Sequence, residues 1–138
     1  GSETQRVNEL FMRALRENNG PVPGELEAFP GLIITTIGAK SGEKRAVPLA
    51  YQVVDGRLVI VASMAGANRN PPWFHNLVKN PEVLVEMNGE SFKARALVTE
   101  GEDRTYLYNK VAEVLPAFKD YATRTSRVIP VVELQRLG

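Results

Sequence analysis

Apolar positions at the start of the chain recur at helical spacing, whereas those beyond residue 31 follow the shorter patterns of strands. The first segment predicts a helix from about Thr4 to Asn18. One face of this helix carries five apolar residues: Val7, Leu10, Phe11, Ala14 and Leu15. Asn19-Gly20 ends the helix, and a linker rich in proline and glycine follows. We expect the apolar face to pack on the core; the alternative for a basic amphipathic helix is contact with a membrane surface.

Six later segments have the branched composition or the alternation of β-strands: Leu32–Thr36, Ala46–Val54, Arg57–Ala62, Glu82–Met87, Glu90–Val98 and Val128–Leu134. Asp55-Gly56 and Asn88-Gly89 each separate two of them, and both dipeptides are typical of two-residue hairpin turns. Ala94 and Ala96 alternate with charged neighbours, so one face of the second hairpin is expected to be exposed. Tight hairpins without crossover helices favour a mainly β, α+β fold with six antiparallel strands closed into a small barrel.

Three further segments between the strands predict helices: 70–79, 99–115 and 117–124. Asn70 followed by Pro71 is typical of a helix start, with the asparagine as N-cap and the proline at the first helical position. Thr99 and Glu102 have the spacing of a capping box at the start of the second helix.

The chain of 138 residues has room for one domain, and we assign residues 25–138 to the barrel and 1–24 to the helix and linker. Gly1-Ser2 resembles the remnant of an expression tag. The absence of cysteine excludes disulfides and thiolate metal ligands, and it fits a cytoplasmic protein. A net charge of +1 argues against nucleic acid as a partner of the whole molecule. No apolar run approaches the roughly 20 residues of a membrane span.

The first cluster with candidate chemistry lies between two predicted strands, over residues 38–45. It combines two glycines with four candidate anion-binding side chains: Lys40, Ser41, Lys44 and Arg45. Glycines allow backbone N–H groups to approach an anion, and the cations add charge. A solvated hairpin loop explains the same composition, so both interpretations stay open.

The second cluster runs from the end of a strand onto a predicted helix start. Its small residues after the strand, such as Ala62, Ser63 and Gly66, would allow a flat ring to lie against the backbone. Arg69 and Asn70 precede the helix start, where an anion is favoured. Trp73 and Asn76 follow on the helix, and alone a tryptophan of this kind is more often part of a core.

The third cluster is Phe118, Tyr121 and Arg124, at three-residue spacing on one side of a short helix. A tyrosine here could donate a proton or orient a carbonyl, although an aromatic packing pair is an equally good explanation. His75 is the single histidine and has no partner for a metal site or a hydrolase triad. So few catalytic side chains suggest that a cofactor carries the chemistry.

In order and spacing, these clusters resemble the deazaflavin-dependent nitroreductase family of split β-barrel oxidoreductases. The resemblance covers roughly residues 31–132 and rests on these elements: Thr35-Thr36-Ile37-Gly38-Ala39-Lys40-Ser41-Gly42, Arg45, Pro48-Leu49, Val61-Ala62-Ser63, Gly66, Asn70-Pro71, Trp73, Asn76-Leu77, Asn80-Pro81, Val83, Tyr121, Thr125, Arg127 and Ile129-Pro130. It implies coenzyme F-420 as cofactor and a quinone, activated enone or nitroaromatic as acceptor.

The resemblance also implies a role for each cluster. Lys40, Ser41, Lys44 and Arg45 would bind the phosphate and glutamates of the coenzyme tail, together with Arg69 and Asn70. Ala62, Ser63, Met64, Trp73 and Asn76 would surround the deazaflavin ring. Ser63 and Tyr121 are the candidate catalytic groups, and Phe118, Tyr121 and Arg124 the candidate substrate-binding groups.

Two alternatives remain at this level. An FMN-binding barrel is disfavoured, because FMN carries one phosphate and the cation cluster is long. A non-catalytic carrier of the coenzyme or of a lipid quinone is a different class of protein. The chain is expected to be a monomer or a homodimer, in the cytoplasm or peripherally at the inner face of the membrane.

Overall fold

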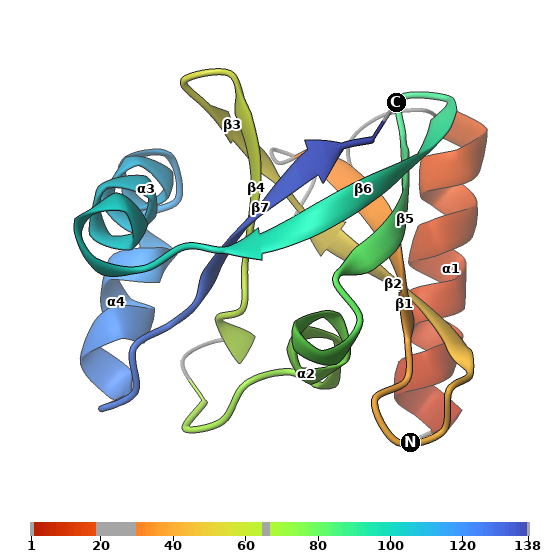
Figure 1. The fold of residues 1–138 in the computed structure, drawn as a ribbon, viewed down its shortest axis with the longest axis horizontal. Helices are drawn as coiled ribbons and strands as arrows, with labels where there is room; N and C mark the ends of the chain where they lie inside the picture. The colour runs from red at the N-terminus through yellow and green to blue at the C-terminus, as the bar shows by residue number, and fades with distance from the viewer. Residues whose placement is uncertain (1, 19–29, 65–66, 138) are drawn as a thin grey trace.

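The computed structural model describes residues 2–18, 30–64 and 67–137 (Figure 1). Within them the elements in chain order are α1 (Ser2–Asn18), β1 (Gly31–Ile37), β2 (Lys44–Ala50), β3 (Gln52–Val54), β4 (Arg57–Val61), α2 (Pro72–Lys79), β5 (Glu82–Met87), β6 (Glu90–Val98), α3 (Gly101–Val114), α4 (Ala117–Arg124) and β7 (Val131–Arg136). The predicted linker before residue 25 lies mostly outside the described residues.

The seven described strands form one antiparallel sheet in the order β2-β1-β5-β6-β7-β4-β3. Its two edge strands, β2 and β3, are consecutive in the chain and meet at Tyr51. One bent segment therefore joins both edges of the sheet, which is the closure of a split barrel. The backbone N–H of Tyr51 donates to the carbonyl of Pro30 across 3.1 Å and fixes this bend.

The α+β split-barrel prediction is confirmed, but the number of strands is seven rather than six. The predicted strand 46–54 is divided because its first half pairs with β1, where Ile34 lies opposite Val47. Its second half pairs with β4, where Val53 lies opposite Leu58. Apolar alternation alone does not show that a continuous run changes its pairing partner.

Two clusters of apolar side chains occupy the two faces of this curved sheet. The main cluster fills the barrel with residues such as Leu32, Val85 and Val132, all fully buried. The second lies under α3 and includes Val111 and Val131. Neighbouring residues in β7 thus face different clusters, as the alternation of a strand requires. The outer face of β6 is exposed, which confirms the predicted wet face of that hairpin.

Helix α1 packs on the barrel beside β1 and β2, as predicted, but only part of the predicted face is covered: Leu15 is buried and Phe11 is partly buried (Figure 1). Met12 and Leu15 are buried against Ile33, whereas Val7 and Leu10 stay 44% and 56% exposed. The apolar stripe of this helix is wider than its contact with the sheet. The sheet, rather than the stripe, therefore decides which residues are covered.

Two predicted helix starts are also wrong. Helix α2 begins at Pro72, and its N-cap is Pro71 without a side-chain cap. The side chain of Asn70 accepts a hydrogen bond from elsewhere in the chain instead. Helix α3 has no capping box, because the Thr99 hydroxyl donates to the carbonyl of Val131 across 2.7 Å. Tertiary partners have replaced local caps in both places.

The helices are distributed around the barrel and leave parts of the sheet between them uncovered. Figure 1 shows α1 beside β1 and β2, and α3 with α4 near β3, β4 and β7. Helix α2 contacts β1 and β6. The candidate site lies between these helices, on β2 and on the loop that leaves β4.

Candidate active site

An apolar pocket with a volume of about 260 Å³ opens between β2, β4, α3 and α4. Its lining residues are Pro48, Leu49, Ala50, Tyr51, Gln52, Val59, Val61, Ser63, Met64, Pro71, Trp73, Val111, Leu115 and Phe118. The size is close to the lower end of ligand pockets, which begin at about 300 Å³. A single flat ring system is the kind of ligand that such a slot accepts.

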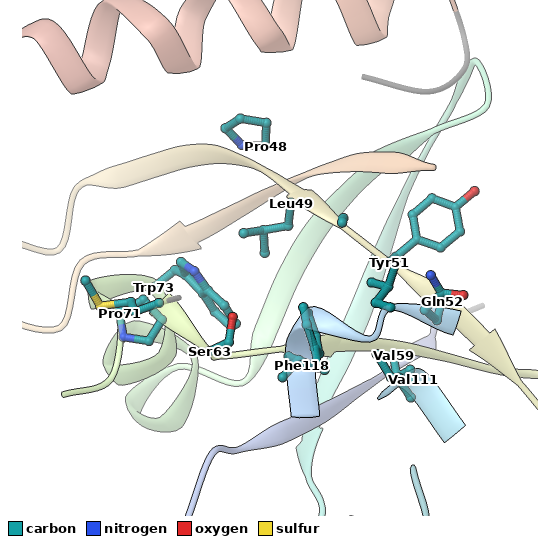
Figure 2. A pocket seen from close by; sticks show the side chains of 14 residues that line it. Pro48, Leu49, Tyr51, Gln52, Val59, Ser63, Pro71, Trp73, Val111 and Phe118 are labelled. Carbon is teal, nitrogen blue, oxygen red and sulfur yellow. The ribbon is translucent and has the colours of Figure 1, made fainter. Parts of the chain in front are cut away.

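The walls of this apolar pocket come from segments that are far apart in the sequence. Figure 2 shows Leu49 on one side and Phe118 facing it from α4. Trp73 and Ser63 lie together at one end, and Tyr51 and Gln52 lie at the other. The hydroxyl of Ser63 is thus a polar group at the tryptophan end of an otherwise mainly apolar slot.

A second, more open cleft of about 680 Å³ adjoins the apolar pocket, and Trp73 lines both. The other lining residues of this cationic cleft are Gly38, Ala39, Lys40, Ser41, Arg45, Val47, Arg69, Asn70, Pro72, His75 and Asn76. Three of them are basic side chains, Lys40, Arg45 and Arg69, and this set includes no carboxylate. The nearby Glu43 pairs with Arg45 across 3.1 Å, but both side chains are exposed, so the pair is weak. The cleft therefore favours an anion.

The loop between β1 and β2 forms one wall of the cationic cleft and is fixed by α2. The Asn76 amide accepts from the backbone N–H of Ala39 at 2.9 Å and donates to the Thr36 hydroxyl at 3.1 Å. Lys79 donates to the carbonyl of Ala39 across 2.8 Å. A Cβ at Gly38 would lie 2.5 Å from the hydroxyl oxygen of Ser41, so a larger residue there would require the Ser41 side chain to move.

The loop that leaves β4 carries the polar end of the apolar pocket. Arg127 donates from its guanidinium to the carbonyls of Ser63 and Ala67 and to the side chain of Asn70. Partial burial lowers the pKa of Arg127 from its usual value. Within this loop Met64 has a positive φ of 45°.

Ten of the predicted site residues line one or both of these cavities. Ser63, Met64, Trp73 and Phe118 line the apolar pocket. Lys40, Ser41, Arg45, Arg69, Asn70, Trp73 and Asn76 line the cationic cleft, so two separate stretches of sequence meet there.

Four predicted residues lie beside the cavities rather than in their walls. Ala62 is fully buried in the barrel core. Lys44 is exposed at the start of β2, and Arg124 is exposed at the end of α4. Tyr121 packs on Phe118, with 5.3 Å between ring centroids, and is half-buried.

Sequence reasoning assigned no role to several residues that line the apolar pocket. Val111 belongs to α3, Leu115 follows that helix directly, and Leu49 belongs to β2; all three were typical core residues in the sequence. Pro48 was the exception, because a proline within a strand indicates that the strand lies at the edge of the sheet. No sequence signal showed that these four side chains meet around a cavity.

Comparison with known proteins agrees with this geometry. The family described as F420H(2)-dependent quinone reductase matches residues 7–136. A Mycobacterium tuberculosis (strain H37Rv) protein named F420H(2)-dependent quinone reductase is 34% identical, over 99% of this chain and 92% of its own. The chain belongs to the F420H(2)-dependent quinone reductase family. The cofactor of this quinone reductase family member is accordingly coenzyme F-420.

Solved structures support the same assignment. One described as an F420-H2 dependent reductase is 36% identical, with a TM-score of 0.68 over 76% of this chain and 93% of its own. Another, described as a domain-swapped dimer, is 33% identical, with a TM-score of 0.70 over 96% and 99% of the two chains. A heme storage protein from Vibrio cholerae, HutZ, shares only the fold, at 14% identity and a TM-score of 0.61 over 95% and 91%.

The cavities of this quinone reductase family member fit the coenzyme that the family name implies. A mainly apolar pocket next to a cleft with three cations matches a ring that carries an anionic tail. Among the described residues, no group of three His, Cys, Asp or Glu side chains is arranged to bind a metal ion. No described helix is long and apolar enough to cross a membrane.

Proposed function

We propose that this protein transfers a hydride from reduced coenzyme F-420 to a quinone at the mouth of the apolar pocket. The observation that carries the proposal is the shared wall at Trp73, which joins an apolar slot to a cationic cleft. A ligand with a flat ring and an anionic tail would occupy both cavities at once. Family membership supports the redox partner and the class of acceptor.

The cationic cleft would bind the tail of the coenzyme. Lys40, Arg45 and Arg69 supply positive charge, and the anchored loop between β1 and β2 holds Lys40 close to α2. Ser41 and Asn70 add polar contacts in the same cleft. Lys44 is an exposed cation at the start of β2, next to this loop, and would act through long-range charge.

The apolar pocket would hold the reactive ring against an acceptor. Trp73 and Met64 lie at one end of the pocket, and Phe118 closes it from α4. Asn76 would contribute to coenzyme binding indirectly, because it fixes the β1–β2 loop. Ala62 would contribute by its packing in the barrel wall behind the pocket. Reduced coenzyme F-420 supplies the hydride when it is bound. The residues around it exclude water and keep donor and acceptor in contact.

Quinone reduction also places negative charge on an acceptor oxygen, and the protein must stabilise that charge. Ser63 has its hydroxyl at the polar end of the pocket and would donate a hydrogen bond there. Tyr121 packs behind Phe118 and would reach the acceptor from the α4 side, next to the exposed Arg124. We propose Ser63 and Tyr121 as catalytic groups on this basis.

Activated enones and nitroaromatics are proposed as further acceptors, because both are flat and develop negative charge on oxygen after hydride addition. The apolar lining of the pocket has few polar groups that would select one class of acceptor over another. A soluble quinone, an enone and a nitroaromatic compared at equal concentration give the order of preference.

We also propose that the protein forms a homodimer. The support is the related structure described as a domain-swapped dimer, which matches nearly the whole chain. Light scattering on the purified protein measures its mass against the 15.2 kDa of one chain.

The proposed reaction is tested by single-turnover kinetics. Protein loaded with reduced coenzyme F-420 is mixed with a soluble naphthoquinone, and the absorbance of the oxidised deazaflavin is followed. The proposal predicts a fast phase that depends on both protein and quinone. A protein that binds the coenzyme without accelerating its oxidation is a carrier, and this outcome overturns the proposed reaction.

A further inference from the structure

We propose that Arg127 is a positioning residue that holds the loop after β4 in the shape that presents Ser63 and Met64 to the apolar pocket. Its Nη2 donates to the carbonyl of Ser63 at 2.7 Å. Its Nε donates to the carbonyl of Ala67 and its Nη1 to Oδ1 of Asn70, both at 2.8 Å. The inference rests on the proposed function, since these partners belong to the proposed coenzyme site.

One residue of this loop has an energetically unfavourable backbone conformation. Met64 has a φ of 45°, in the left-handed region that a side chain disfavours, and such residues occur where the surroundings impose them. The carbonyl of Met64 accepts the N–H of Ala67 at 3.0 Å. Arg127 binds the carbonyl of Ser63, just before Met64, and the carbonyl of Ala67. One guanidinium therefore fixes both sides of the strained residue.

The partners of Arg127 are matched to arginine in particular. All three acceptors are neutral oxygens, and the guanidinium meets them with three different nitrogens. A planar fork with fixed donor directions satisfies this arrangement, whereas a lysine ammonium concentrates its donors at one point. Partial burial of the guanidinium makes loss of these partners costly, because the charge would remain without them.

The segment around Arg127 also connects the two walls of the pocket. It follows α4, which supplies Phe118 to the opposite wall. Thr125 donates to Oδ1 of Asn68 at 2.8 Å, and Pro130 accepts the N–H of Ala62 at 3.0 Å. Residues 125–130 thus contact the described parts of the loop on both sides, at residues 62–63 and 67–70, with Arg127 as the longest side chain in this contact.

The test uses Arg127→Gln and Arg127→Lys in the full chain. We expect Arg127→Gln to weaken coenzyme F-420 binding about tenfold or more and to slow hydride transfer from the bound coenzyme. Arg127→Lys should recover only part of the loss. Arg57→Gln is the matched control, because it removes an ion-pairing arginine from the β3–β4 hairpin outside both cavities, and it should change stability alone.

A second substitution tests the strained conformation directly. Glycine tolerates positive φ, so Met64→Gly in the Arg127→Gln background should recover about fivefold to tenfold of the lost affinity. Met64→Ala removes the same side chain but keeps the Cβ, and it should recover nothing. Equal recovery in both double variants would overturn the argument from strain.

Amide hydrogen exchange of Ala67 gives a readout that needs no coenzyme. We expect the exchange rate to rise at least about tenfold in Arg127→Gln, with the Leu77 amide as the unaffected reference. If affinity, hydride transfer and Ala67 exchange all stay as in the wild type, Arg127 has no positioning role, and the proposed function stands. If the wild type fails to bind the coenzyme, the proposed function fails, and Ala67 exchange alone decides the role of Arg127.

Discussion

The side-chain oxygen of Asn76 on α2 accepts the backbone N–H of Ala39 in the β1–β2 loop, with 2.9 Å between nitrogen and oxygen. Nδ2 of the same amide donates to the hydroxyl of Thr36, so both ends of the side chain are in use. One residue therefore ties the cation-bearing loop to the helix that carries Trp73. The relative placement of the cationic cleft and the apolar pocket depends on this contact.

We predict that Asn76→Ala weakens coenzyme F-420 binding about tenfold or more without preventing folding. The loop loses its bridge to α2, and two partly buried polar groups lose their partner, which costs about 1–3 kcal/mol. Fluorescence titration measures the affinity, and urea denaturation measures the free energy of unfolding. Val78→Ala, on an exposed position of the same helix, is the control and should change neither by much. Wild-type affinity in Asn76→Ala would show that the loop is held by other contacts.

Charge reversal in the cationic cleft should weaken coenzyme binding in a salt-dependent manner. We expect the double variant Lys40→Glu, Arg45→Glu to lose at least about tenfold in affinity at low ionic strength, and less as salt screens the charges. The matched control is Lys93→Glu with Arg95→Glu, which reverses two charges on the outer face of β6. If both double variants behave alike, the tail does not bind in this cleft.

Ser63→Ala and Tyr121→Phe should each slow hydride transfer more than they weaken coenzyme binding. Each variant removes a hydroxyl proposed to stabilise charge on the acceptor oxygen, and loss of one such donor costs about tenfold to a thousandfold in rate. Stopped-flow absorbance at saturating coenzyme separates rate from affinity. Thr123→Val removes a hydroxyl from the exposed side of α4 and is the control. A wild-type rate in either variant removes that residue from the proposed catalytic pair.

The free energy of unfolding should fall in acid, because an ion pair outside the site is lost when its carboxylate is protonated. Hydrogen bonds from Arg57 lower the pKa of the Asp103 carboxyl below its usual value. A group with a lowered folded pKa stabilises the protein above its unfolded pKa of about 4, and this contribution disappears as pH falls through the folded pKa. The urea midpoint should thus drop less between pH 7 and pH 3 in Arg57→Gln than in the wild type. Lys110→Gln, which removes an exposed pair with Glu113, should leave that drop unchanged.

Much of the fold could be predicted because a two-residue hairpin turn is determined by the residues of the turn itself. Asp55 and Asn88 have positive φ in their turns, with Gly56 and Gly89 after them, as the sequence indicated. The division of the 46–54 strand at Tyr51 was not predictable, since it depends on which strands lie beside each half. The helix starts failed for the same reason: Thr99 and Asn70 bond to β7 and to Arg127 rather than to their own helices.

The candidate site was predictable where its chemistry is carried by charge and by a family resemblance. Lys40, Arg45 and Arg69 stood out as cations in loops, and the structure brings them to one cleft. The apolar side chains of the pocket, such as Leu49 and Val111, could not be separated from core residues. The role of Arg127 was hidden as well, because its three partners lie about sixty residues earlier in the chain.

The most direct test of the account is a fluorescence titration of the protein with coenzyme F-420, with its tailless deazaflavin fragment and FMN in parallel. If the apolar pocket holds the ring and the cationic cleft holds the tail, intact coenzyme F-420 should bind most tightly. Its advantage over the tailless fragment should shrink as ionic strength rises. Equal affinity for the intact and tailless forms, or a preference for FMN, would contradict the assignment of the two cavities.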